Sequence, residues 1–213
     1  MAIETLTEAE FGAAAKRAGN EHWKNAVSRW SYHQAAIDCV RRVAPDRATD
    51  VLELGTMGIS IVKGSDTMDY AEKWKAKHFT PTFQHDAREM PWPATDGRYA
   101  VFVALRVFHH LRPHQAACFH EARRIARNIV IVTPTDYDVK ALRDTSSGIE
   151  EAEVMGWNGG LPPTECLRFG DWRGNLYFWD EATLKRGMEQ FGAIHGDGAA
   201  ALVTPRQAPQ CAS

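Results

Sequence analysis

Three acidic residues stand at or just beyond the predicted ends of successive strands, and their types suit an adenosine ligand. Glu53, followed by Gly55, lies at the end of the first strand, Asp69 ends the second extended segment, and Asp86 follows the third. Ligands of open parallel sheets lie beyond the carboxyl ends of the strands. One carboxylate can bind ribose hydroxyls, a second side chain can accept from the adenine amino group, and a glycine lets the backbone approach closely. Each acid also has a simpler interpretation, Glu53 as a buried hydrogen-bonded acid and Asp69 or Asp86 as a helix cap.

Two adjacent histidines, His109 and His110, follow the predicted strand 99–105. The unperturbed pKa of histidine lies near neutral pH, so either ring could take the proton from a reacting hydroxyl group. The alternative is that His-His-Leu only begins a helix and packs. We treat both histidines as candidate catalytic residues.

These side chains need a sheet to bring them together, and the order of the predicted elements supplies one. Strands alternate with helices, which is typical of an α/β fold with helices on both faces of a mostly parallel sheet. Two short strands near the end of the chain predict an antiparallel hairpin. The predicted strands are 51–54, a segment within 59–69, 79–84, 99–105, 129–132, and the hairpin 193–195 with 199–203; the predicted helices are 6–43 with a break at 19–20, 70–77, 113–127, 149–154 and 181–190.

The chain divides into a predicted helical cap and a predicted sheet domain. Residues 1–47 form the N-terminal helical cap, and residues 48–204 form the sheet domain. Residues 135–175 are rich in Gly, Pro, Asp and Thr and predict an insertion over the sheet. Residues 205–213 predict a frayed tail.

Composition and charge exclude several classes of protein. The 213 residues are 44% apolar with a formal net charge of -2, which argues against a disordered chain and against a nucleic-acid binder. The four cysteines form no C-x-x-C pair, which argues against a zinc site or a disulfide framework, and Cys39 and Cys118 are predicted to be buried thiols. The acidic amino terminus and the lack of a long apolar run predict a cytoplasmic protein with no membrane contact and no metal. The oligomeric state is open, with a homodimer as one alternative.

Five segments resemble, in order, the motifs of class I S-adenosylmethionine-dependent methyltransferases. The first motif of that family is similar to VLELGTMG at 51–58, and HDAREMPW at 85–92 resembles the segment whose Asp, followed by a small residue, reads the adenine. Residues 96–111 resemble the fourth strand and the His-His-Leu that follows it, residues 119–134 the next helix and strand, and residues 176–192 the closing helix. The resemblance covers about residues 48–204 and implies a Rossmann-like three-layer sandwich.

The resemblance implies S-adenosyl-L-methionine as the cofactor, bound across the carboxyl ends of the first, second and fourth strands. It implies that Asp69 binds the ribose, with Asp66 as the alternative, and that Asp86 with Ala87 reads the adenine. The remaining implied contacts are Glu53, Gly55, Thr56 and Met57 on the methionine side, and Leu105 and Arg106 near the methyl group.

Aromatic residues outside the predicted sheet are the candidate residues for closing the site and binding the acceptor. Trp30 and Tyr32 precede the first strand and could close over the cofactor, as aromatic residues of N-terminal helices do in similar enzymes. Trp157, Trp172 and Tyr177 belong to or flank the insertion and could line an acceptor pocket. Packing of these rings in the core is the alternative. No Asn-Pro-Pro-aromatic sequence follows strand 99–105, which argues against methylation of adenine or glutamine amino groups.

Two departures from the family pattern leave two functions open. Met57 and Ile59 stand where glycines are usual, and only 13 residues separate Gly55 from Asp69. A parallel crossover normally takes a dozen or more residues, so we expect a loop at 56–65 in place of the first crossover helix. The first hypothesis is methyl transfer to an oxygen of a small-molecule or glycan-like acceptor. The second is a catalytically inactive, methyltransferase-like binding or scaffold module. A nucleotide-binding oxidoreductase is disfavoured because the first loop lacks G-x-G-x-x-G.

Overall fold

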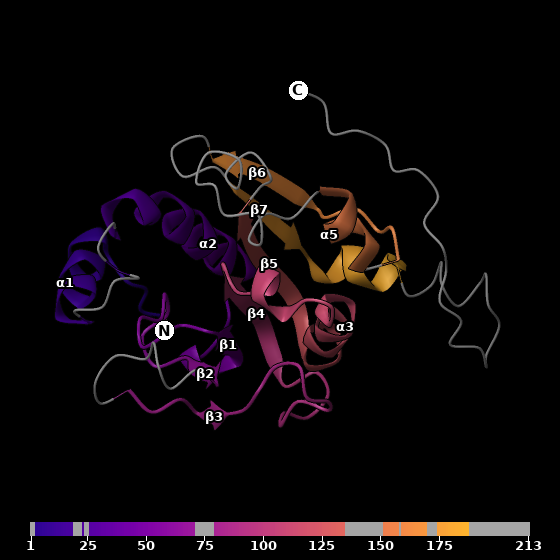
Figure 1. The fold of residues 1–213 in the computed structure, drawn as a ribbon, viewed down its shortest axis with the longest axis horizontal. Coiled ribbons are helices and arrows are strands. Elements are labelled where there is room, and N and C mark those ends of the chain that lie inside the picture. The colour runs from indigo at the N-terminus through magenta and orange to yellow at the C-terminus, as the bar shows by residue number, and fades with distance from the viewer. Residues whose placement is uncertain are drawn as a thin grey trace.

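A seven-stranded mixed sheet forms the centre of the protein in the computed structural model, which describes residues 3–18, 23, 26–70, 79–134, 151–157, 159–169 and 174–187. The strand order is β3-β2-β1-β4-β5-β7-β6 (Figure 1). Neighbouring strands from β3 to β5 run parallel, whereas β7 is antiparallel to both β5 and β6. The strands are β1 (Val51–Leu54), β2 (Asp66–Asp69), β3 (Phe83–Gln84), β4 (Tyr99–Leu105), β5 (Ala126–Pro134), β6 (Glu165–Phe169) and β7 (Gly174–Trp179).

Helices cover both faces of this sheet. Helix α2 lies on one face, and α3 with α5 lies on the other (Figure 1). Side chains of β4 alternate between a core on the α2 side, which contains Val101, and a core on the α3 side, which contains Phe102. The expected three-layer α/β sandwich is therefore confirmed. The helices are α1 (Glu8–Ala18), α2 (Trp30–Val43), α3 (Gln115–Ile125) and α5 (Glu151–Trp157), with 3-10 helices η2 (Ala26–Arg29), η3 (Ala48–Asp50) and η4 (Phe108–Leu111).

The predicted elements agree with the structure in the first part of the sheet and differ near the end of the chain. Strands β1 and β4 have the predicted bounds, and α3, α5 and β5 lie within a few residues of theirs. The segment predicted as strand 79–84 pairs only at Phe83–Gln84. Strand β7 was not predicted: residues 176–179, at the start of the segment likened to the closing helix, belong to this strand. The antiparallel pairs of the sheet are β5 with β7 and β6 with β7, not the predicted hairpin. The predicted hairpin 193–203, the helix after residue 70 and the tail lie outside the described residues, while residues 181–187 are helical as predicted.

A loop joins β1 to β2, as the short spacing predicts. Residues 55–65 contain turns and bends but no helix. The N-terminal segment lies along this loop: the Leu6 N–H donates to the Ile61 carbonyl at 2.8 Å, and the Lys63 N–H donates to the Glu4 carbonyl at 2.9 Å. Thr5 and Val62 form an antiparallel bridge between these two bonds. We call residues 4–6 the N-terminal strap.

Helix α1 packs over the same loop. Phe11 and Ala15 of α1 form a small core with Trp23 and Ile59, and Met57 of the loop packs against this core. The N-terminal residues thus pack on the loop that joins β1 to β2. The division of the chain at residues 47 and 48 stays a prediction.

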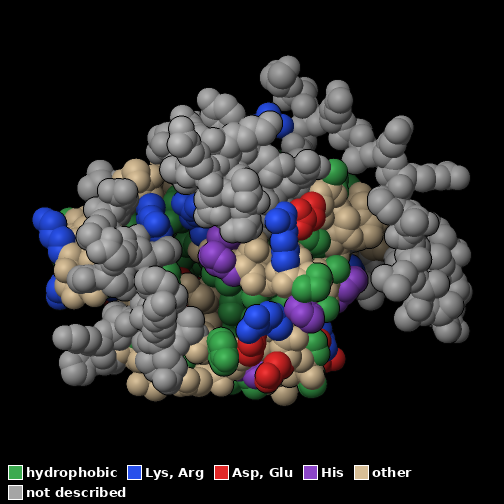
Figure 2. Space-filling view, in the orientation of Figure 1, with side chains coloured by type: hydrophobic (Ala, Val, Ile, Leu, Met, Phe, Trp, Pro, Cys, Tyr) green, Lys and Arg blue, Asp and Glu red, His purple; other side chains and the backbone are tan. Residues whose placement is uncertain are grey.

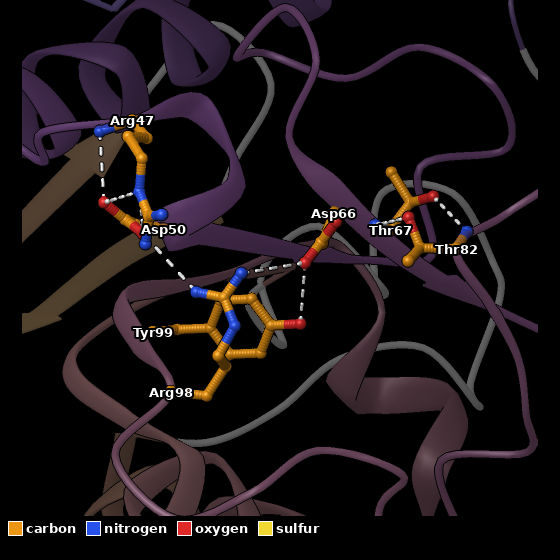
Figure 3. Close-up of polar contacts among 7 residues, drawn as sticks. All are labelled: Arg47, Asp50, Asp66, Thr67, Thr82, Arg98 and Tyr99. Carbon is orange, nitrogen blue, oxygen red and sulfur yellow. Dashed lines mark hydrogen bonds and ion pairs between the residues drawn. The ribbon is translucent and has the colours of Figure 1, made fainter.

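An ion-pair network ties together the amino ends of three strands (Figure 3). The Arg98 guanidinium lies 3.4 Å from the Asp50 carboxylate and 3.7 Å from that of Asp66. The Tyr99 hydroxyl also donates to Asp66, at 3.0 Å. Asp50, Asp66 and Tyr99 precede or begin β1, β2 and β4, so this network lies at the edge of the sheet opposite to the carboxyl ends.

Two cysteines are buried, as predicted. Cys39 and Cys118 are buried free thiols, and burial raises the pKa of the Cys118 thiol to about 12. Within the described ranges, no three His, Cys, Asp or Glu side chains gather as a metal site. In the same ranges, none of the helices combines the length and apolarity that crossing a bilayer requires.

Candidate functional site

The carboxyl ends of β1, β2 and β4, with the segment that follows β3, form the candidate site. The loop after β1 and the segment after β3 both reach the end of β2, because the Gly55 N–H donates to the Met68 carbonyl and the His85 N–H to the Asp69 carbonyl. Figure 2 shows basic, acidic and histidine side chains around a hollow near the middle of this view, with hydrophobic side chains at its floor. This edge of the sheet is where ligands of open parallel folds bind.

Glu53 holds the loop between β1 and β2. Its buried carboxylate accepts from the N–H groups of Ile61 (2.8 Å) and Val62 (2.9 Å) and from the Ser65 hydroxyl (2.8 Å). Burial raises the pKa of Glu53 to about 7, against the opposing effect of these three donors. The structure therefore places Glu53 as the buried hydrogen-bonded acid considered from the sequence.

Gly55 sits in a position that only glycine fills without strain. Its φ is 69°, in the left-handed region. A Cβ atom built at Gly55 would lie 2.5 Å from Cγ2 of Val107, which follows β4. The close approach brings the end of β1 directly against the segment after β4. Val107 was not predicted to belong to the site, and no pattern in the sequence marks it.

Asp69 meets the loop that follows Gly55. Its Oδ2 atom accepts from the Met57 N–H at 3.0 Å, and Met57 has a φ of 50°. The Thr56 hydroxyl accepts from the Gly58 N–H at 3.2 Å, which closes the turn. The structure thus brings Asp69, Thr56 and Met57 together at the carboxyl edge. Asp66, the alternative ribose ligand, begins the same strand and lies in the network at the opposite edge.

Asp86 and Ala87 lie at the end of the segment after β3. Arg88 binds both carboxylate oxygens of Asp86 through its Nε (2.9 and 3.1 Å), and its guanidinium lowers the pKa of that carboxyl. The Ala87 side chain is buried, and its carbonyl accepts from the Trp92 indole at 2.9 Å and from the Cys118 thiol at 3.2 Å. The backbone at Ala87 is therefore held in place by hydrogen bonds from Trp92 and from Cys118 of α3.

The end of β4 carries the remaining predicted cofactor contacts. Arg106 has a φ of 59°, and its N–H donates to the Val132 carbonyl of β5 at 2.8 Å. A positive φ at a residue with a Cβ is uncommon and is often found at functional sites. Leu105 lies beside Arg106 and lines a small cavity.

His109 and His110 lie on η4, directly after this strand end. Their rings are in contact, with centroids 3.8 Å apart and planes tilted by 42°. His109 is buried and His110 is exposed. The neighbouring Phe108 packs on Trp157 of α5, with ring centroids 5.1 Å apart, so η4 is anchored to the α3 side of the sheet.

The predicted acceptor-binding aromatics are mostly in the core. Trp157 and Tyr177 are buried in the core on the α3 side, and the Tyr177 hydroxyl accepts from the Asn175 amide at 2.9 Å. Tyr32 is buried at the start of α2, and Trp30 is partly buried beside it. Trp172 lies outside the described residues.

The space at the methionine side of the predicted cofactor site is nearly filled. The cavity lined by Tyr32, Gly55, Thr56 and Leu105 has a volume of about 20 Å³, room for about one water molecule. His33 also lines it; burial lowers the pKa of His33 to about 4, and its Nδ1–H donates to the Arg29 carbonyl at 2.8 Å. The lining residues therefore fit an adenosyl cofactor in kind, and the first turn of α2 closes the space that its methionine end needs.

No family model matches the chain, and no curated protein matches it. Among solved structures, a SAM-dependent methyltransferase from Aquifex aeolicus superposes with a TM-score of 0.51 at 16% identity, over 78% of this chain and 97% of that one. A second similar structure, a methyltransferase of unproven activity from Bacillus halodurans C-125, gives a TM-score of 0.41 at 18% identity, over 70% of this chain and 79% of that one. The strand order and the parallel pairing of β1 with β4 indicate the same fold as the superposition on the Aquifex structure. The chain therefore has the fold of the class I S-adenosylmethionine-dependent methyltransferases.

Proposed function

We propose that the protein transfers a methyl group from S-adenosyl-L-methionine to an oxygen atom of a small-molecule or glycan-like acceptor. The observation that carries the proposal is the meeting of Gly55, Met57 and Asp69 at the carboxyl edge, where the backbone comes close to a buried carboxylate. Binding of an adenosine ligand needs both features at this place. The fold itself does not fix the reaction.

Each residue of the edge has a role in this proposal. Asp69 binds the ribose hydroxyls, and Asp86 with the Ala87 backbone binds the adenine. Glu53 keeps the loop after β1 in place through its hydrogen bonds to Ile61 and Val62. The other contacts are Gly55, Thr56 and Met57 on the methionine side, and Leu105 and Arg106 beside the methyl group.

The histidines of η4 are assigned to the acceptor side. When bound, the cofactor supplies an electrophilic methyl group on a positively charged sulfur. His109 or His110 would take the proton of the acceptor hydroxyl group that receives this methyl group. Positioning supplies much of the help in such an in-line displacement. Tyr32, Trp157, Trp172 and Tyr177 are the aromatic residues proposed to shape the acceptor site.

A catalytically inactive binding module is the second candidate. The cavity of about 20 Å³ beside Tyr32 and Gly55 favours it, because a methionine side chain does not fit there without movement of α2. The occupied carboxylate of Glu53 favours it as well.

Calorimetric titration with S-adenosylhomocysteine tests the proposal. Asp69→Ala is compared with Asp66→Ala, because both residues belong to β2 but lie at opposite edges of the sheet. We expect micromolar binding by the wild-type protein, a loss of at least about tenfold in Asp69→Ala, and unchanged binding in Asp66→Ala; tenfold corresponds to about 1.4 kcal/mol. Thermal unfolding confirms that each variant is folded. No binding by the wild-type protein at millimolar ligand would favour the inactive module.

A further inference from the structure

Two buried polar side chains stand opposite each other on β5 and β7. Thr133 is completely buried and Asn175 is 5% exposed. The Thr133 Oγ1 and Asn175 Oδ1 atoms are buried and have no hydrogen-bond partner in the part of the chain that the structure describes. A buried polar atom without a partner destabilises a fold, so its retention calls for a reason.

The register of the sheet places this pair beside the candidate site. Thr133 pairs with Asn175 in the antiparallel ladder between β5 and β7, two residues along from the pairing of Ile131 with Tyr177. Thr133 is the last residue but one of β5, and the preceding Val132 accepts the Arg106 N–H at the end of β4. The pair therefore lies at the carboxyl edge, next to the strand end assigned to the methyl group.

The two side chains share the face of the sheet that carries η4 and α5. Residues two apart on a strand point to the same face, and Ile131 and Tyr177 belong to the core on the α3 side. His109 and Trp157 come from η4 and α5, which pack on this side. The pair thus lies on the side of the sheet that carries the proposed base.

The chemistry of the pair fits a hydroxyl group. The Asn175 amide nitrogen donates to the Tyr177 hydroxyl at 2.9 Å, which orients the amide and leaves Oδ1 as an acceptor. The Thr133 hydroxyl can donate or accept. A ligand hydroxyl can donate to Asn175 Oδ1 and accept from Thr133 Oγ1, and so satisfy both atoms at once.

We infer that Thr133 and Asn175 bind a hydroxyl group of the methyl acceptor and are specificity-determining residues of the acceptor site. The inference rests on the proposed function for its place in the reaction. The acceptor is then a molecule whose ring or chain hydroxyl reaches the face of β5 and β7 beside η4.

Phenol and toluene, which have nearly the same shape, form a matched pair of probes. Their affinities are measured by ligand-observed NMR, both with and without S-adenosylhomocysteine. We expect the wild-type protein to bind phenol at least about tenfold more tightly than toluene, because toluene leaves both polar atoms unpaired. Thr133→Val, which keeps the shape of the side chain, should reduce this ratio, because only the hydrogen bond to Asn175 Oδ1 remains.

Two further variants complete the test. Asn175→Leu is combined with Tyr177→Phe so that their hydrogen bond is removed at both ends. This double variant should also reduce the preference for phenol, because only the Thr133 hydroxyl remains. Ile129→Val, on the same strand and face but away from the carboxyl edge, should keep the preference. Thr133→Val should also raise the melting temperature, whereas a purely structural role for the hydroxyl would make it fall.

The outcomes separate the two proposals. Equal binding of the two probes by the wild-type protein, binding of neither, or a preference for phenol that is undiminished in Thr133→Val would overturn the inference. A wild-type protein that prefers phenol but does not bind S-adenosylhomocysteine would overturn the proposed function and leave the hydroxyl site standing.

Discussion

Four residues around the candidate site have left-handed backbone conformations. Gly55, Met57, Gly58 and Arg106 have φ values of 69°, 50°, 90° and 59°, and Met57 and Arg106 carry side chains. Such conformations cost free energy and persist where the surrounding structure fixes them. Here they are fixed by hydrogen bonds from Met57 to Asp69 and from Arg106 to Val132. The strain is therefore concentrated where the loop after β1 meets the end of β4.

Gly55→Ala should destabilise the protein more than Gly97→Ala. Both glycines have a positive φ, but a Cβ at Gly97 meets no atom within 4 Å, whereas one at Gly55 lies 2.5 Å from Val107. We expect the Gly97 variant to lose about 1 kcal/mol from backbone strain and the Gly55 variant about 1–3 kcal/mol more, from overpacking. Urea unfolding measures both, and equal losses would show that Val107 moves aside freely.

Glu53 should make the stability of the fold fall as the pH rises. The folded protein has a Glu53 pKa of about 7, above the ordinary value of 4.5, so folding favours the protonated form. The stabilisation is complete below about pH 4.5 and is lost as the pH rises through 7, at most by about 3 kcal/mol.

Glu53→Gln isolates this contribution, because every other titrating group cancels in the difference between variant and wild type. The free energy of unfolding is measured from pH 4.5 to 8. We expect the advantage of the wild-type protein over the variant to shrink with rising pH. A difference independent of pH would show that Glu53 is ionised in the folded protein throughout this range.

The positions of the candidate site residues in the fold could be predicted, but not all of their contacts. Asp69 and Asp86 were predicted as site residues because their strand ends follow from the hydrophobic pattern. The partners of Glu53 could not be predicted, since the N–H groups of Ile61 and Val62 reach it only after the loop has folded. The contact of Gly55 with Val107 likewise depends on the side-by-side pairing of β1 with β4.

At the scale of elements, the N-terminal strap and α1 stand beside the loop that replaces the first crossover helix. The strap pairs with residues 61–63 of the loop, and α1 covers Ile59. Lys63 adds an ion pair to Glu10 of α1, at 2.6 Å. The loop is thus fixed by Glu53 from inside and by the N-terminal residues from outside.

Phe11→Ala should loosen the packing of α1 and the N-terminal strap on the loop between β1 and β2 without unfolding the sheet. Phe11 is 1% exposed and packs on His33, with ring centroids 4.4 Å apart. We expect the free energy needed to open α1 and the N-terminal strap locally to fall by about 3–5 kcal/mol. Hydrogen exchange should accelerate at the amides of Ile61 and Lys63 and stay unchanged in β4.

Gly12→Ala is the matched control, since its added methyl group meets no atom within 4 Å and alanine favours a helix. It should leave exchange in the loop unchanged or slower. If Phe11→Ala accelerated exchange in β4 as much as in the loop, the N-terminal residues and the sheet would form one cooperative unit, contrary to the predicted boundary after residue 47.

Strand β7 shows where the prediction of elements fails. Its residues, Gly174–Trp179, are buried on both faces, so they show no alternation of apolar and polar side chains. A short, continuously apolar run fits a strand or a buried helix equally well. Its pairing with β5 and β6 is decided by distant parts of the chain, which local sequence does not reveal.

At the scale of the whole molecule, the two ends of the parallel strands differ: the amino ends have a structural role, and the carboxyl ends form the candidate binding site. The amino ends of β1, β2 and β4 are tied by the Arg98 network, whereas the carboxyl ends carry the strained backbone and the buried acids (Figure 3). The strand order and the layers were predictable because they follow from the alternation of strands and helices. The position of Tyr32 beside the carboxyl ends was predicted as well, whereas the small volume left there, about 20 Å³, was not, because it depends on how α2 packs against the loop after β1.

The cavity beside Tyr32 and Gly55, about 20 Å³ in volume, has a consequence for the kinetics of binding. A ligand that needs more room binds only to the fraction of molecules in which the start of α2 has moved away, and its apparent affinity is reduced by that fraction. In stopped-flow mixing with S-adenosylhomocysteine, the observed rate should therefore reach a plateau equal to the opening rate. Phe11→Ala should raise that plateau, whereas a rate that rises linearly with ligand would mean that the cavity is open before the ligand arrives.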